Sequence, residues 1–319
     1  MKKAIISGIS GQDGAYLSEL LINKGYNVFG LTRDLDEDNF WRLTYLGIRE
    51  NVKLIKCDLE DFSQITSIIQ RVQPDEIYNL AAQSSVSLSF KIPKETLTFN
   101  LISLINLLEA IRLVKPDIRF YQASSSEIFG DAQVLPITEE TILNPVSPYA
   151  ISKASGFWMT KNYREAYNLF SCSGILFNHE SYLRSDNFFI KKVIRESIAI
   201  SKGLQPVLKV GNLEVKRDFG SAKRYVEAMF LMLQHNKADD FLICSGVSIK
   251  LSEIIKYVFE YLSIPSYKCV VDKELYRPLE IHEIYGDSSK AKKVLGWSYN
   301  IEFEDIVKEL INEELKNWK

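Results

Sequence analysis

Short β-branched runs alternate with longer amphipathic stretches along the first half of the chain. Runs rich in Val and Ile predict strands, whereas apolar residues at helical spacing predict helices. The predicted strands cover residues 4–7, 27–32, 52–57, 76–81 and 119–123, and the predicted helices cover residues 13–23, 65–72 and 97–113. Since strands that alternate with helices form a parallel sheet covered on both faces, we expect an α/β fold with a doubly wound sheet.

The second half of the chain has a less regular pattern. Its predicted helices cover residues 148–167, 188–200, 222–233, 252–262 and 303–318, and its predicted strands cover residues 172–177, 207–210, 241–244 and 268–271. No repeat or low-complexity linker divides the chain. We therefore expect a core over residues 1–177 and a smaller C-terminal α/β lobe over residues 178–319, with segments that cross back to the core.

Composition narrows the class of protein. The 39 basic and 41 acidic residues give a net charge of −2, which provides no general affinity for nucleic acid or for an anionic membrane. The four cysteines and three histidines are scattered without metal-ligand spacing, so we expect no metal and a reducing, cytoplasmic location. The apolar run after Met1 breaks at Gly8, and we expect neither a signal peptide nor a membrane-spanning segment.

Three glycines, Gly8, Gly11 and Gly14, lie between the first predicted strand and the first predicted helix. Glycine lets a tight turn bring backbone N–H groups against a pyrophosphate at the positive end of a helix. Turn glycines alone are a weak signal, but the strand–turn–helix context is that of a Rossmann-type dinucleotide site. We interpret this turn as a phosphate loop.

The end of the second predicted strand selects the cofactor. An acid there binds the ribose 2′-hydroxyl of NAD, whereas a basic residue accommodates the 2′-phosphate of NADP. Thr32 occupies the position of the acid and Arg33 follows it, which favours NADP, but the adjacent Asp34 keeps NAD open. Asp58 and Leu59 follow the third strand and are expected near the adenine, and Asp58 alternatively caps a helix.

A Tyr–Lys pair, Tyr149 and Lys153, is spaced by about one helical turn. A neighbouring ammonium favours the phenolate, so we expect Lys153 to lower the pKa of Tyr149 and make it a base. Residues 124–127, Ser-Ser-Ser-Glu, follow the fifth predicted strand at the carboxyl end, where parallel sheets build their sites. A chance pair and a serine-rich turn are the alternative interpretations. Together with the phosphate loop, these residues indicate a short-chain dehydrogenase site.

Several longer segments give the chain a resemblance to a known family, the GDP-mannose 4,6-dehydratases. The most specific are Gly-Gln-Asp-Gly at residues 11–14 and Asn-His-Glu-Ser at residues 178–181. Others, in chain order, are residues 78–84, 122–130, 162–167, 174–177, 216–220, 225–229, 277–280, 286–287 and 295–297. The resemblance covers essentially the whole chain, and it implies a GDP-sugar as the substrate.

The resemblance implies an internal redox cycle on one hexose. Tyr149 would deprotonate the 4-hydroxyl while NADP takes hydride from C4, with Ser125 hydrogen-bonding the 4-oxygen and Lys153 holding the nicotinamide ribose. Glu127 would then remove the acidified C5 proton and water would leave from C6. Hydride would return to C6 and give a 4-keto-6-deoxy sugar. A solvated loop acid is the alternative interpretation of Glu127.

The resemblance also assigns the binding residues. The cofactor-binding residues are Gly8, Gly11, Gln12, Asp13, Gly14, Arg33, Asp58, Leu59, Leu80, Ala81, Ala82, Tyr149 and Lys153. The substrate-binding residues are Ser84, Ser125, Glu127, Asn178, Arg184, Lys192, Arg217, Arg277 and Glu280. Arginine suits phosphate oxygens, and an ordinary surface charge is the alternative for each basic residue, most of all for Lys192.

The chain departs from the family pattern at four places. Ser125 replaces a threonine but keeps the hydroxyl, and Phe219 replaces a tryptophan. Asp34 replaces a second arginine in a loop that contributes to NADP binding and to tetramer contacts in the family, so both expectations are weakened. Residues 182–185 read Tyr-Leu-Arg-Ser in place of Pro-Arg-Arg-Gly near the substrate, which keeps a GDP-linked heptose open.

Two other functions and two oligomeric states stay open. A 4-epimerase or 4-ketoreductase of the same fold needs Tyr149 and Lys153 but no carboxylate at residue 127. A silent NADP-binding protein is disfavoured by the intact catalytic set. The helices predicted over residues 97–113 and 148–167 resemble those that pair across dimers in this fold. We therefore expect a homodimer, with a homotetramer as the alternative.

Overall fold

The computed structural model describes residues 1–318, and within them the largest sheet has seven strands, all parallel. Its order, β10-β6-β5-β4-β1-β2-β3, is that of a doubly wound Rossmann-type sheet, as expected. The strands are β1 (Lys3–Ser7), β2 (Asn27–Thr32), β3 (Val52–Lys56), β4 (Glu76–Asn79), β5 (Arg119–Ser125), β6 (Ser171–Leu176) and β10 (Phe241–Ile243).

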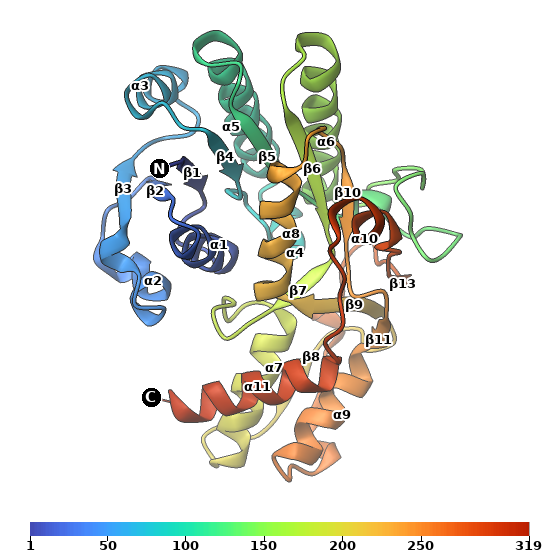
Figure 1. Ribbon diagram of the computed structural model, residues 1–319. Coiled ribbons are helices and arrows are strands. Elements are labelled where there is room, and N and C mark those ends of the chain that lie inside the picture. Colours follow the sequence, from blue (N-terminus) through green and yellow to red (C-terminus); the bar gives the residue numbers. More distant parts are fainter. Residues whose placement is uncertain (319) are drawn as a thin grey trace.

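Helices cover both faces of this sheet because neighbouring strand residues point to opposite sides. Ile6 packs into the core beside α1 and α8, whereas Ile5 packs into the core beside α3 and α5. Figure 1 shows α5 and α6 lying side by side on their face of the sheet. The helices are α1 (Gln12–Asn23), α8 (Ala222–Gln234) and α10 (Ser289–Leu295) on one face, and α3 (Phe62–Val72), α5 (Pro93–Val114) and α6 (Pro148–Tyr167) on the other.

One helix contradicts an expectation from the sequence. α5 is 22 residues long and has a window of mean hydropathy 1.6, so it is long and apolar enough to cross a bilayer. The expectation that no apolar stretch is long enough to span a bilayer is therefore wrong for α5, by length and composition. Its apolar residues have another partner, because Leu104, Leu107 and Leu108 are fully buried in the core that includes α3 and the sheet.

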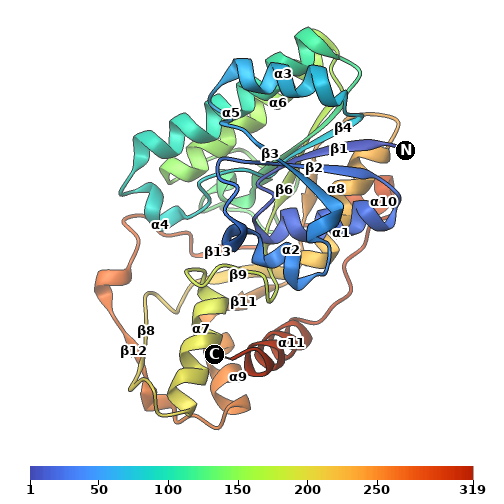
Figure 2. The same cartoon turned by 90° about the vertical axis from the view of Figure 1, so that its left-hand side faces the viewer.

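The smaller lobe is built around β9 (Lys216–Ser221). This strand pairs with β7 (Asn178–Glu180), β11 (Ser248–Lys250) and β13 (Glu283–Ile284). A separate two-stranded sheet joins β8 (Leu208–Val210) to β12 (Cys269–Val271). Three helices pack together beside these strands in Figure 2: α7 (Phe189–Ser201), α9 (Leu251–Tyr261) and α11 (Phe303–Lys316).

The sequence pattern misplaced two helix starts and missed several short elements. α3 begins three residues before its predicted start at residue 65, and α5 begins four residues before its predicted start at residue 97. The elements that were not predicted are α2 (Trp41–Tyr45), α4 (Val86–Ser89), α10, β7, β9, β11, β13 and the 3₁₀ turns Glu37–Phe40, Arg49–Asn51, Ser126–Phe129, Ser266–Lys268 and Lys273–Leu275. The chain after residue 177 contributes to both lobes, because β10 lies in the large sheet and α8 covers it.

Candidate active site

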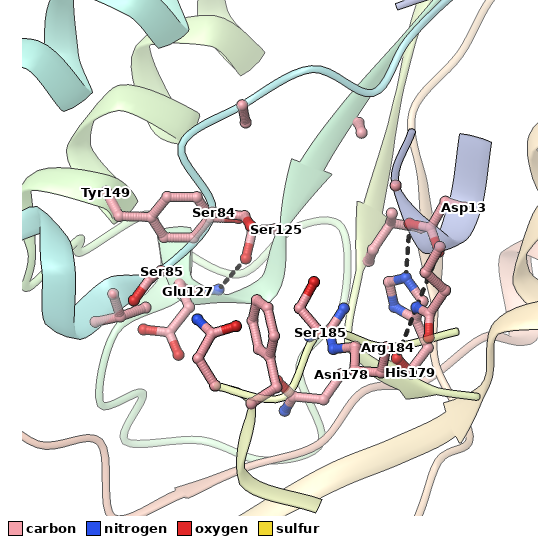
Figure 3. Close-up of a pocket in the computed structure, with 18 of the residues that line it drawn as sticks. Asp13, Ser84, Ser85, Ser125, Glu127, Tyr149, Asn178, His179, Arg184 and Ser185 are labelled. Carbon is pink, nitrogen blue, oxygen red and sulfur yellow. Dashed lines mark hydrogen bonds and ion pairs between the residues drawn. The ribbon is translucent and has the colours of Figure 1, made fainter. Parts of the chain in front are cut away.

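A cavity of about 870 Å³ lies where the carboxyl ends of the large sheet meet the smaller lobe. Figure 3 shows Tyr149, Ser125 and Glu127 on one side of it and Asp13, His179 and Arg184 on the other. Of the residues predicted for the site, the cavity lining includes Gly8, Gly11, Gln12, Asp13, Gly14, Arg33, Leu59, Leu80, Ala81, Ala82, Ser84, Ser125, Glu127, Tyr149, Lys153, Asn178, Arg184, Lys192, Arg217, Arg277 and Glu280. Residues far apart in the chain thus converge on one space.

The phosphate loop requires glycine at two of its positions. Gly8 has φ +72°, a conformation that side chains disfavour, and a Cβ there would lie 2.8 Å from the Ala81 nitrogen. A Cβ on Gly14 would lie 2.4 Å from the Gly8 carbonyl oxygen, so the helix packs directly on the turn. Gly11 stands as the N-cap of α1 without a side-chain cap, which leaves the first N–H groups of the helix available to a phosphate.

The cavity wall fits a dinucleotide. The Ser124 hydroxyl is buried and has no hydrogen-bond partner among residues 1–318, although it lines the cavity. Such a group is satisfied by a polar ligand. At the end of β2, Arg33 lies over the Phe99 ring at 5.2 Å, and Asp34 accepts hydrogen bonds from the Asp36 backbone at 3.1 Å and the Asn39 amide at 3.4 Å. Arg33 and Asp34 both line the cavity, so both cofactor choices stay open.

The catalytic helix α6 begins at a well-defined cap. The Ser147 hydroxyl accepts a hydrogen bond from the Ala150 N–H at 3.0 Å, and Pro148 occupies the first turn. This start fixes Tyr149 and Lys153 in the first two turns, where both are buried and line the cavity. Lys153 Nζ donates to the Ala123 carbonyl at 2.8 Å, which anchors it to the carboxyl end of β5.

The electrostatics of the pair differ from the expectation. Burial raises the pKa of Tyr149 to about 12, while its hydrogen bond with Ser125 opposes the rise. Burial also lowers the pKa of Lys153 to about 8. Lys153 Nζ lies 5.8 Å from the Tyr149 ring centroid, and it donates a hydrogen bond to the Ala123 carbonyl. The prediction that Lys153 lowers the tyrosine pKa is therefore wrong, and the neighbours that favour the phenolate are Ser125, through a hydrogen bond, and Arg184, through its charge.

Glu127 lies in the same wall, at the start of the 3₁₀ turn after β5. Its backbone N–H donates to the Ser125 hydroxyl at 3.3 Å, and its side chain is 14% exposed. Arg277 Nη1 lies 3.7 Å from Glu127 Oε1 and 3.8 Å from Glu280 Oε1. The carboxylate is thus beside the tyrosine site, as a base for a neighbouring carbon requires, and it is not a fully solvated loop acid.

The positive groups of the substrate side come from the smaller lobe. Arg217, on β9, is buried and donates to Glu280 at 3.2 Å, and desolvation lowers its pKa although Glu127 opposes this. Lys192 Nζ donates to the Lys209 carbonyl at 2.8 Å. Arg184 stacks on the Phe188 ring at 3.7 Å. These cations line a single cavity, which suits a diphosphate.

One predicted residue does not line the cavity. Asp58 is exposed, and its carboxylate accepts from the Glu60 N–H at 3.0 Å within its own turn. It does not cap the following helix either, because Asp61 accepts from the first-turn N–H groups of α3. The alternative interpretation of Asp58 as a helix cap is therefore wrong.

Sequence reasoning missed several residues that line the site, among them His179 and Ser124. His179 is buried beside Asp13 and lines the cavity. The sequence did hold a signal for His179, because it belongs to the family-specific segment Asn-His-Glu-Ser. Within that segment the sequence analysis assigned a role only to the asparagine. Ser124 belongs to the strand-end serines, but nothing in the sequence tells which of them faces the cavity.

The seven-stranded doubly wound sheet, the glycine loop and the Ser–Tyr–Lys wall define a nicotinamide-dependent enzyme of the short-chain dehydrogenase/reductase class. Solved structures share this fold. The dTDP-glucose 4,6-dehydratase of Bacillus anthracis in complex with NAD is 19% identical with a TM-score of 0.87, covering 99% of this chain and 97% of that chain. The UDP-glucose 4-epimerase of Thermotoga maritima with UDP-glucose is 21% identical with a TM-score of 0.89, covering 99% of this chain and all of that chain.

The chain belongs to the GDP-mannose 4,6 dehydratase family, whose model matches residues 5–310. GDP-mannose 4,6 dehydratase 2 of Arabidopsis thaliana is 44% identical, over 99% of this chain and 87% of that protein. The resemblance noted in the sequence is thereby confirmed, and the family is one of sugar-nucleotide lyases.

Proposed function

We propose that the protein converts GDP-mannose to GDP-4-keto-6-deoxymannose by removing water, with NADP as a tightly held cofactor. The observation that carries the proposal is the position of Glu127 in one cavity wall with Ser125 and Tyr149. Its support comes from the curated relatives, which are GDP-mannose 4,6-dehydratases over nearly the whole chain. A dehydratase needs this carboxylate, whereas simple oxidation and reduction at C4 do not.

Tyr149 and Ser125 act on the 4-oxygen of the sugar. The Tyr149 phenolate takes the proton of the 4-hydroxyl, and the Ser125 hydroxyl hydrogen-bonds the same oxygen. A bound nicotinamide cofactor would supply the hydride acceptor and, once reduced, the hydride donor, together with a positive charge in its oxidised form. A positive charge favours the phenolate, as the Ser125 hydrogen bond does, against the rise in the Tyr149 pKa that burial causes. Lys153, anchored on the Ala123 carbonyl, holds the cofactor ribose.

Glu127 acts after C4 has become a ketone. The ketone acidifies the C5 proton, and the Glu127 carboxylate takes it. The same carboxyl group then donates a proton to the departing 6-hydroxyl, so water leaves with no net change at Glu127. As hydride returns to C6, C5 takes up a solvent-exchanged proton, which balances the proton released from the 4-hydroxyl. Arg277, 3.7 Å from Glu127 Oε1, holds the carboxyl group in place through these two steps.

The substrate's diphosphate is held by the positive wall. Arg217, Arg277 and Lys192 supply the charge, and Asn178 and Glu280 supply polar contacts to the ribose. Arg184 and Ser84 complete the wall nearest the sugar. Residues 182–185 depart from the family pattern, so the same site is the place where a GDP-linked heptose would replace mannose.

The choice of NADP follows from Arg33. Its guanidinium lies over Phe99 at the end of β2, where a 2′-phosphate would sit. Asp34 is the residue that supports NAD, and its carboxylate is held by Asp36 and Asn39 within its own loop. Tighter binding of NAD than of NADP would overturn this part of the proposal.

We further propose a cytoplasmic homodimer. The cysteines Cys57, Cys172, Cys244 and Cys269 are all free, which suits a reducing compartment. α5 and α6 carry large apolar side chains that are exposed in the single chain: Ile102, Leu113, Ile151 and Trp158. Burial of such a surface between two copies stabilises a dimer. A tetramer is the alternative.

The proposal is tested by incubating the protein with GDP-mannose and catalytic NADP and following the product mass. A dehydratase gives a product that has lost one water, without consuming NADP. An epimerase gives a product of unchanged mass, and a 4-ketoreductase acts on a keto-sugar and consumes NADPH. Either of these results would replace the proposed function. Water loss from a GDP-heptose but not from GDP-mannose would change the substrate and keep the mechanism.

A further inference from the structure

The two most family-specific segments of the sequence lie against each other. Gln12 and Asp13 lie between the last two glycines of the phosphate loop, at the start of α1, and residues 179–181 belong to β7 and the turn after it. Asp13 Oδ2 lies 2.9 Å from His179 Nε2 (Figure 3). Gln12 Nε2 donates to the His179 carbonyl at 3.2 Å, and the Ser181 hydroxyl donates to Gln12 Oε1 at 2.6 Å. These contacts join the cofactor side of the cavity to the substrate lobe.

Arg42, on α2, fastens the same segment from outside. Its guanidinium donates to the Leu183 carbonyl at 2.6 Å, to the Ser10 carbonyl at 2.9 Å and to the Ser185 hydroxyl at 3.1 Å. A single side chain therefore ties the phosphate loop to residues 179–185, which we call the strap. Arg42 is absent from the cavity lining, so its side chain lies outside the space that the ligands would fill.

His179 is also fixed by several contacts. His179 Nδ1 lies 2.7 Å from the Phe177 carbonyl, and the ring stacks against Tyr225 with centroids 4.7 Å apart. Burial raises the pKa of Asp13, but the neighbouring His179 outweighs it and the net pKa is lowered. Asp13 is therefore a carboxylate aimed at the strap, on the first turn of the helix that faces the phosphates.

We propose that Arg42, Asp13 and His179 are positioning residues that hold the strap against the phosphate loop and thereby retain the cofactor between the two hydride transfers. The strap residues Glu180, Arg184 and Ser185 line the same cavity as the loop. A dinucleotide on the loop therefore lies beside the strap, and it leaves fastest when these hydrogen bonds are broken.

Retention of the cofactor matters because the proposed reaction uses the same hydride twice. The hydride taken from C4 returns to C6 of the same sugar. If the cofactor dissociated between the two transfers, the oxidised sugar would remain in the site without its hydride. The inference thus rests on the proposed function. Its test measures cofactor release directly, and so gives a result whether or not GDP-mannose is the substrate.

The test compares Arg42→Met with Arg119→Met. The two arginines are matched, because Arg119 also donates to two backbone carbonyls, of Leu233 and His235, and also lies over an aromatic ring. Arg119 lies outside the cavity lining. The measurements are the Kd and dissociation rate of NADP, by fluorescence, together with the melting temperature.

We expect Arg42→Met to bind NADP about tenfold more weakly, through faster release, since it loses hydrogen bonds from a charged donor. Excess NADP should restore its turnover. Because a bound ligand also stabilises a weakened fold, the dissociation rate is measured well below the melting temperature, where both variants are folded. Arg119→Met should lose melting temperature without a change in Kd. Equal NADP release from Arg42→Met and the wild type would overturn the proposal.

A second comparison separates the strap from direct cofactor contacts. Asp13→Asn and His179→Gln each break one side of the same contact. If the pair acts by holding the strap, the double variant releases NADP no faster than the faster single variant. Multiplying effects would mean independent contacts with the cofactor and would remove Asp13 and His179 from the proposal. Hydrogen exchange at residues 179–185 should rise in both single variants, and unchanged exchange would contradict the strap.

Discussion

Lys153 carries a buried charge whose cost depends on pH. Its pKa falls from 10.5 to about 8 on burial. Between these values the unfolded chain binds more protons than the folded protein, so this residue's contribution to the free energy of unfolding rises from pH 8 to pH 10.5. Below pH 8 the charge destabilises the cofactor-free protein by at most about 3 kcal/mol, because one pKa unit corresponds to about 1.4 kcal/mol.

We therefore expect Lys153→Met to stabilise the cofactor-free protein at pH 7, with an advantage that shrinks as the pH is raised from 8 to 10. Urea denaturation across this range measures it. Lys161→Met is the control, because Lys161 lies on the same helix but its side chain is 40% exposed. An advantage for Lys153→Met that stays constant with pH would contradict the buried charge. The same variant should be nearly inactive.

Single residues show where sequence reasoning succeeds and where it stops. Tyr149, Lys153 and Glu127 follow from local spacing and strand position, and the structure brings them to one cavity. The partner of Asp13 does not follow, because 166 residues separate it from His179. Only the pairing of β7 with β9, which no local pattern encodes, brings that histidine to the phosphate loop.

At the scale of elements, α6 positions the chemistry through its first turn. Ser147→Ala removes the hydroxyl that accepts from Ala150 and should cost about 1 kcal/mol of stability. Because Tyr149 and Lys153 lie directly after the cap, we expect kcat to fall about tenfold as well. Asp61→Ala, which uncaps α3 at a distance from the site, should lose similar stability at unchanged kcat. Equal loss of kcat in both variants would show that the cap acts only through stability.

The elements that were predicted share a strong pattern, and those that were missed lack one. Each strand of the large sheet contains a short apolar run, because helices cover both faces of the sheet. β9 reads Lys-Arg-Asp-Phe-Gly-Ser, yet most of it is buried. Asp218 is satisfied there by the backbone N–H groups of Ser245 and Gly246, at 2.9 Å each. Burial of polar residues by distant loops is invisible in a hydropathy pattern.

At the scale of the molecule, the exposed apolar faces of α5 and α6 predict a dimer. Trp158 is 54% exposed in the single chain although it is among the largest apolar side chains on α6. Trp158→Glu should shift the protein to monomer in sedimentation velocity, because a charge is costly in an apolar interface. Tyr267→Glu is the control, since Tyr267 is 74% exposed in the smaller lobe. A Trp158→Glu dimer as tight as that of the wild type would place the interface elsewhere.

The central claim is that Glu127 takes the C5 proton of the sugar, and deuterium incorporation tests it most directly. The wild type and Glu127→Gln are incubated in D₂O with GDP-mannose and NADP, and C5 is examined by NMR. We predict deuterium at C5 in the wild-type product, and in Glu127→Gln a loss of both C5 exchange and water elimination by about a hundredfold or more, while oxidation at C4, seen as NADPH absorbance, persists. Normal C5 exchange in Glu127→Gln would contradict the account.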